Sequence, residues 1–164
     1  MEREEDGIRV FSLSKPEKGA LVFKADTIVN TSLDSLLGLI IDIDNYMNWI
    51  PGGKGSNTLT KVSQIEYIGH VIVDIGTFFS DRDFVVRAKG FQDPESKNVS
   101  ILYTSIDGYL PKLSHTVRIE DNQGIWILAP LEKNKVHLTI SPSASDAKGN
   151  AVSVSSENGV IIIK

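Results

Sequence analysis

The sequence predicts an α+β fold in which an antiparallel β-sheet curves around a helix. Most segments alternate apolar and polar residues with a period of two, as strands with one buried face do. Only one stretch shows the three- and four-residue spacing of an amphipathic helix. Two strand-like segments precede this stretch and a long run of them follows it, an order typical of α+β domains.

The strand-like segments are bounded by residues that favour turns. The first two are expected to form a hairpin whose turn runs from Pro16 to Gly19. The expected strands cover residues 8–12, 20–29, 62–75, 84–90, 98–105, 113–120, 124–129 and 135–141.

The helix is expected over about residues 32–43. Thr31 and Ser32 offer a hydroxyl N-cap, and the leucines and isoleucines that follow recur at helical spacing. Pro51 prevents the helix from continuing, and the glycines after it, at positions 52, 53 and 55, indicate a loop.

Length and composition indicate one domain over residues 1–164. The chain is 41% hydrophobic and 23% charged, as globular domains are. No apolar run approaches the length of about 20 residues that a membrane-spanning helix needs. The N-terminus is charged where a signal peptide would be apolar, so the sequence favours a soluble, cytoplasmic protein.

Charge and residue usage argue against several classes of function. The net charge is −4, and the 17 Lys and Arg residues are scattered, which disfavours a nucleic-acid partner. The absence of cysteine removes disulfides, thiolate catalysis and Cys-based zinc sites. His70, His115 and His137 fall on separate expected strands without metal-site spacing, so we expect them at the surface or core edge and predict no metal. The sequence shows no P-loop or dinucleotide fingerprint, and we predict no cofactor.

Several motifs in a fixed order resemble the START family of lipid-transfer domains, and bacterial START-like proteins most closely. The strand pair and helix are followed by Y-x-x-W-x-P at Tyr46, Trp49 and Pro51, then by VIVDIG, SDRDF at residues 80–84 and GIWILAPLEKNKVHLTI. The similarity covers about residues 7–150. It implies a helix-grip fold, in which the sheet curls around a long C-terminal helix and an apolar tunnel holds one lipid-like ligand. The implied activity is binding and carrying without chemistry, and transient membrane contact is compatible with it.

The charged residues of the SDRDF motif are interpreted as structural. Asp81, Arg82 and Asp83 lie between two expected strands, where their side chains can cap a turn and pair with one another near water. The alternative is an acid/base cluster, because paired carboxylates beside an arginine can shift each other's pKa. Trp49 is expected to be a core anchor at the helix end.

The ligand is expected to contact one face of the strands. Phe84, Val86 and Ala88 alternate with Arg87, so we assign the former to the interior and the latter to the outside. The candidate ligand-binding residues are Ile65, Tyr67, Val71, Phe84, Val86, Tyr103 and His115. Of these, Tyr67, Tyr103 and His115 are expected to supply the polar contacts.

At two positions the sequence differs from the residues that some family members carry. Some steroid-carrying members keep an acid and an arginine inside the tunnel, at places that align approximately with Val71 and Ala88. A tunnel without this charged pair favours a lipid or other hydrophobic ligand held by apolar burial.

The tail from Ala151 to Lys164 also departs from the family. Its Ser, Asn and Gly residues among β-branched ones oppose the expected closing helix and favour strand. The run from Val160 to Ile163 is expected to pair with a sheet edge or with a second chain, which would give a homo-oligomer. The alternative is that the chain is a fragment or has an altered reading frame at its end.

Two other functions remain open at this stage. The broader superfamily includes polyketide cyclases and aromatases, and His115 would be the best general base for such an enzyme. A non-catalytic interaction module would use the open sheet face to dock a partner. An apolar pocket favours the carrier, convergent ionisable groups favour the enzyme, and a flat or filled face favours the module.

Overall fold

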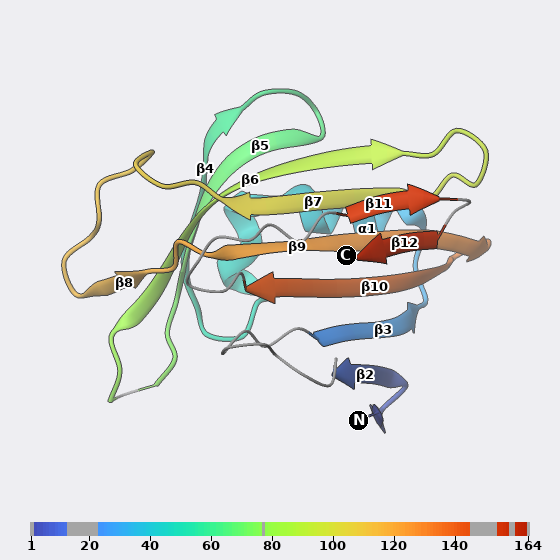
Figure 1. Ribbon diagram of the computed structural model, residues 1–164, viewed down its shortest axis with the longest axis horizontal. Coiled ribbons are helices and arrows are strands. Elements are labelled where there is room, and N and C mark those ends of the chain that lie inside the picture. Colours follow the sequence, from blue (N-terminus) through green and yellow to red (C-terminus); the bar gives the residue numbers. More distant parts are fainter. Residues whose placement is uncertain (1, 13–22, 77, 145–153, 158–159, 164) are drawn as a thin grey trace.

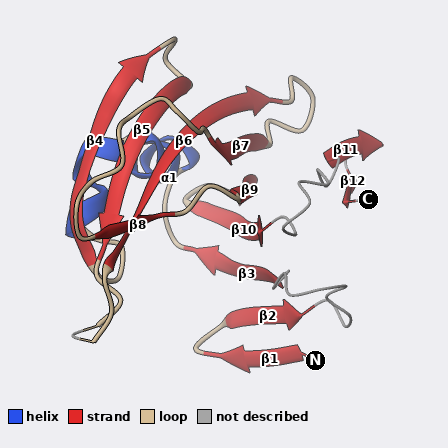
Figure 2. Cartoon of the chain, turned by 60° about the vertical axis from the view of Figure 1, so that its left-hand side comes forward, coloured by secondary structure: helices blue, strands red, loops and turns tan. Residues whose placement is uncertain are grey.

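A curved antiparallel sheet forms most of the computed structural model, which describes residues 2–12, 23–76, 78–144, 154–157 and 160–163. The strands of the main sheet follow the order β1-β2-β3-β10-β9-β7-β6-β5-β4, and β8 pairs with β6 in parallel. Figure 1 shows this order across the sheet, and Figure 2 shows how strongly β4, β5 and β6 turn away from β10 and β3. The strands are β1 (Glu2–Glu5), β2 (Ile8–Ser12), β3 (Phe23–Val29), β4 (Gly53–Lys61), β5 (Glu66–Val73), β6 (Asp81–Gln92), β7 (Val99–Ser105), β8 (Thr116–Arg118), β9 (Asn122–Glu132) and β10 (Lys135–Ala144).

The predicted helix forms as α1 (Leu33–Ile41) and continues into a 3-10 helix, η1 (Ile43–Asn48). Ser32 is its N-cap, because the Ser32 side chain accepts a hydrogen bond from the Ser35 backbone at 3.1 Å. At the other end, the Tyr46 hydroxyl donates to the carbonyl of Ile40, one of the groups that a helix end leaves unpaired. Both helices lie on one face of the sheet (Figure 2).

The segment expected to be a glycine loop contains the start of strand β4, so this part of the prediction was wrong. Gly53 opens β4, and a Cβ there would overlap the backbone of Met47. Glycine is needed at this position for the close approach of β4 to η1, and it does not mark a loop. The next strand, β5, is shorter than expected, because the amides of Val62 and Ser63 donate to the Glu66 carbonyl and form a turn.

The strand that carries the SDRDF motif also differs from the prediction. β6 begins at Asp81, so the three charged residues lie within the strand and not in a turn before it. The long segment that joins β7 to β9 contains only the short strand β8, where a strand over 113–120 was expected.

The core lies between the helices and the concave face of the sheet. Ile40 and Ile43 are almost completely buried there, together with Val71, Ala88 and Ile101 from the strands. Gly69 of β5 faces Ile43, and a Cβ at this glycine would come within 2.7 Å of that side chain. The missing side chain lets η1 pack directly on the sheet.

The C-terminal tail forms strands, as predicted, but they pair with each other. β11 (Val154–Glu157) and β12 (Val160–Ile163) make an antiparallel two-stranded sheet, whereas a sheet edge or a second chain was expected as the partner. The expected turn at Pro16–Gly19 lies outside the described residues, as do residues 145–153. Among the described helices, none has the length and apolar character needed to cross a bilayer.

Candidate functional site

A cavity of about 190 Å³ lies between the helices and the concave face of the sheet. The helical side contributes four residues and strands β5, β6, β7 and β9 contribute the rest. The lining consists of Ile40, Ile43, Tyr46, Ile50, Tyr67, Val71, Val73, Phe84, Val86, Ala88, Ile101, Tyr103, Asn122 and Trp126.

The structure brings most of the predicted ligand-binding residues together at this cavity. Tyr67, Val71, Phe84, Val86 and Tyr103 all lie in its wall. Their contact with a ligand stays a prediction. Their alternation along the strands placed them on one face, and antiparallel pairing aligns Val71 with Phe84 and Ala88 with Tyr103.

Two predicted residues lie elsewhere. Ile65 is exposed in the turn before β5, and its carbonyl accepts a hydrogen bond from the Gly90 amide at 2.7 Å. The expected strand began at residue 62, whereas β5 begins at Glu66, so Ile65 precedes the alternating part of the strand. His115 is exposed in the loop before β8 at a φ of +67°, so it is not part of the cavity wall.

The described residues that line the cavity carry no charged side chain. Val71 and Ala88 face the cavity, as the sequence predicted. Arg87 has the opposite orientation and binds Glu66 on the outer side of the sheet, with Nε 2.9 Å from Oε1. Among the described residues of the lining, there is no Asp, Glu, Lys, Arg or His.

Three tyrosines provide most of the polar groups in the wall. The hydroxyls of Tyr46 and Tyr67 both donate to the Ile40 carbonyl, the latter at 3.4 Å. Burial raises the pKa of each tyrosine, that of Tyr103 to about 12, so all three keep the hydroxyl proton near neutral pH. Trp49 packs edge-on against Tyr46, with ring centroids 5.0 Å apart, outside the cavity lining.

Sequence reasoning missed the helical side of the cavity and both residues that β9 contributes to it. Ile40 belonged to the apolar stripe of the predicted helix, but the pattern does not distinguish a residue that fills the core from one that borders a space. Trp126 alternates with Ile125 and Ile127, so both faces of β9 are apolar and the pattern could not show which one points inward. Asn122 precedes this run and gave no signal.

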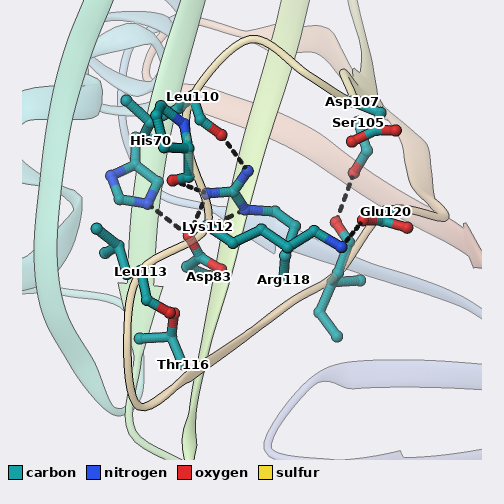
Figure 3. A network of polar contacts seen from close by, with 12 residues as sticks. His70, Asp83, Ser105, Asp107, Leu110, Lys112, Leu113, Thr116, Arg118 and Glu120 are labelled. Carbon is teal, nitrogen blue, oxygen red and sulfur yellow. Dashed lines mark hydrogen bonds and ion pairs between the residues drawn. The ribbon is translucent and has the colours of Figure 1, made fainter.

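A separate polar cluster lies on the outer side of the sheet, where Asp83 is fully buried (Figure 3). Its Oδ2 accepts hydrogen bonds from His70 Nε2 at 2.9 Å and from two nitrogens of Arg118. The sequence had placed Asp83 near water and His70 at the surface or core edge. Both predictions were wrong, because the segment between β7 and β9 covers this part of the sheet.

The other two charged residues of the motif bind other groups, whereas the three charged residues were expected to pair with one another. Asp81 binds Lys54 at 2.9 Å, and Arg82 donates to the Ser80 carbonyl at 2.6 Å. Neither residue lines the cavity. The acid/base interpretation therefore finds no support at this cavity.

Similarity to known proteins is found at the level of structure. No protein-family model matches the sequence, and no curated protein sequence matches it. A STAR-related lipid transfer protein from Xanthomonas axonopodis is 21% identical with a TM-score of 0.80, over 87% of this chain and 79% of that one. The lipid transfer and protein localization domain of human StarD13 is 15% identical with a TM-score of 0.73, over 92% of this chain and 76% of that one.

An enzyme also shares the architecture. The ZhuI aromatase/cyclase from a Streptomyces species is 14% identical with a TM-score of 0.55, over 77% of this chain and 68% of that one. These similarities show that the chain has the START-like helix-grip fold predicted from its motifs. Because the same fold hosts a lipid-transfer protein and an enzyme, function has to be argued from the cavity.

Proposed function

We propose that this protein is a START-like domain that binds a lipid or other hydrophobic small molecule in its central cavity and carries it without chemistry. The supporting observation is the cavity itself, whose described lining is apolar apart from tyrosine hydroxyls and one amide. Pockets that bind small molecules have this character, an apolar surface with a few polar groups that orient the ligand. Burial of apolar ligand surface supplies about 25 cal/mol per Å² before the costs of association.

The cavity also weighs against the two alternatives. A cyclase needs an acid or base at its substrate, and the residue expected to provide one, His115, is exposed outside the cavity. Burial raises the pKa values of the wall tyrosines, so each keeps its proton near neutral pH and no phenolate is available as a general base. An interaction module would present a flat or filled sheet face, but this face borders a cavity.

Transient contact with a membrane is part of the proposal. The loop that joins β5 to β6 projects beyond the sheet (Figures 1 and 2), and it exposes 95% of Phe78 and 65% of Phe79. Ile75 is exposed in the same loop. Exposed aromatic side chains at a projecting tip suit insertion among lipid headgroups, where an apolar ligand could be exchanged.

Native mass spectrometry of the chain purified from its own host tests the proposed function. We expect a population whose mass exceeds that of the polypeptide by one small molecule and which loses that molecule in organic solvent. Incubation with a total lipid extract of the host should refill the empty protein. Protein that carries nothing before and after this incubation would contradict the proposal.

A further inference from the structure

The polar groups at the cavity are not equivalent, because some are already hydrogen-bonded within the protein. The hydroxyls of Tyr46 and Tyr67 both donate to the Ile40 carbonyl at the end of α1. Each has therefore used its only donor hydrogen. These two tyrosines close the helical end of the cavity and have no O–H left to donate to a ligand.

Tyr103 differs from the other two tyrosines. Within the part of the chain that the structure describes, its hydroxyl has no hydrogen-bond partner. Gly124 lies opposite Tyr103 on the neighbouring strand, and a Cβ at that position would overlap the Tyr103 hydroxyl. The absence of a side chain at Gly124 therefore leaves room for the Tyr103 ring. The Tyr103 hydroxyl is not fully buried, so its donor hydrogen is accessible to a ligand in the cavity.

Asn122 lies next to Tyr103 on the same side of the sheet. It is two residues from Gly124 along β9, so both positions face the concave surface and Asn122 is a diagonal neighbour of Tyr103. The Asn122 backbone amide donates to Ser105, but its side-chain amide has no partner among the described residues. This amide can both donate and accept. Tyr103 and Asn122 together form one polar end in an otherwise apolar lining.

Charge and size restrict what this polar end can receive. The described lining contains no ionised side chain to pair with a ligand charge, and an unpaired buried charge costs several kcal/mol. The cavity volume of about 190 Å³ is close to that of a cavity of about 150 Å³ that holds benzene, and below the range of about 300–1,000 Å³ for drug-sized ligands. A molecule with two long acyl chains would extend beyond the described lining.

We infer that the ligand is a compact, uncharged molecule with one hydrogen-bonding group, such as an alcohol or carbonyl, which binds to Tyr103 and Asn122. This inference rests on the proposed function and specifies its ligand class. The single short chain or small ring system of such a molecule fills the apolar part of the cavity beside Ile43 and Trp126.

Three ligands of equal chain length test the inference: octanol, octanoate and octane. Their dissociation constants are measured by displacement of a neutral fluorescent probe from the full chain, its Tyr103→Phe variant and its Tyr109→Phe variant. Tyr109 is a matched control, because it is exposed and its hydroxyl bonds to Thr60 outside the cavity. Melting curves establish that each variant is folded.

We expect the wild type to bind octanol more tightly than octanoate at neutral pH. Tyr103→Phe should weaken octanol binding about three- to tenfold, the value of one hydrogen bond, and leave octane binding unchanged. Tyr109→Phe should change neither. Equal binding of octanol by the wild type and folded Tyr103→Phe, or octanoate binding as tight as that of octanol, would overturn this inference alone. Failure of all three ligands to bind the wild type would also overturn this inference, whereas the proposed function fails only if the protein takes up nothing from the lipid extract either.

Discussion

The guanidinium group of Arg118 donates two hydrogen bonds to the buried carboxylate of Asp83, from Nε at 3.0 Å and from Nη2 at 2.8 Å. The same group donates to the backbone carbonyls of Leu110 and Pro111, at 3.0 and 3.3 Å. Arg118 thereby fastens the long segment between β7 and β9 to the outer side of β6 (Figure 3). Both residues have almost no exposed side-chain surface, so water does not screen the pair.

Asp83→Asn should destabilise the fold strongly, because it leaves the Arg118 charge buried without a countercharge. The expected loss in the free energy of unfolding is about 3–5 kcal/mol, measured by urea denaturation. Asp81→Asn is the matched control, since it removes only the more exposed ion pair with Lys54 and should cost about 0.2–1 kcal/mol. Equal losses in the two variants would contradict the role assigned to Asp83.

The same pair should make stability depend on pH. Burial alone would raise the pKa of the Asp83 carboxyl, but hydrogen bonds from Arg118 and His70 outweigh burial and hold this pKa below its ordinary value. A carboxyl with a lowered pKa in the folded state stabilises the protein above its unfolded pKa of about 3.9, and this contribution is lost as the pH falls toward the folded pKa.

The difference in unfolding free energy between wild type and Asp83→Asn should therefore shrink in acid. Urea denaturation of both proteins at a series of pH values measures it. Other carboxyls, such as Glu66, are common to the two proteins and cancel in the difference. A gap that stays the same from neutral pH into strong acid would show that Asp83 does not carry this pH dependence.

Val86→Trp should block the cavity, because Val86 lies in its wall and an indole ring would occupy the space for the ligand. Binding of a neutral fluorescent probe should be lost while the circular dichroism spectrum is kept. Val117→Trp makes the same change at an exposed position on β8 and should bind the probe as the wild type does. Undiminished binding by folded Val86→Trp would argue against this cavity as the ligand site.

Replacing Phe78 and Phe79 with serine should weaken binding to phosphatidylcholine vesicles by at least tenfold in a flotation assay. Each ring is worth about 1.5–3 kcal/mol when it leaves water, and both are exposed in the free protein. Phe91→Ser removes an exposed ring at the far end of β6 and should leave vesicle binding unchanged. If the serine variant and the wild type float alike, the tip of this loop is not the membrane contact.

The C-terminal tail can be tested by sedimentation of the full chain beside a chain that ends at Asn150. We expect the full chain to associate through its strand-forming tail and the shorter chain to be monomeric, because the two tail strands pair with each other and leave strand edges that can pair with a second copy. A compact, stable monomer in both cases would refute the role of the tail in association.

The sequence by itself determined those features that depend on local periodicity and on ordered motifs. Period-two alternation placed Phe84 and Val86 on the inner face of β6 and Arg87 on the outer face, and helical spacing together with the Ser32 cap located α1. The two motifs at Tyr46 and at residues 80–84 indicated the fold. The apolar cavity itself was implied by the resemblance to the START family, and the alternation only selected candidate residues for its wall.

Tertiary structure alone decided which residues meet across long sequence separations. Arg118 is 35 positions from Asp83, and nothing in the motif around Asp83 indicates that a distant segment will cover it and turn an expected surface acid into a buried one. Gly53 opens a strand because η1 passes close beside it, and His115 is excluded from the cavity by the path of the segment before β8. Local patterns report which face of an element is apolar, whereas burial of a polar group depends on what packs against it, and that is set by contacts between segments far apart in the chain.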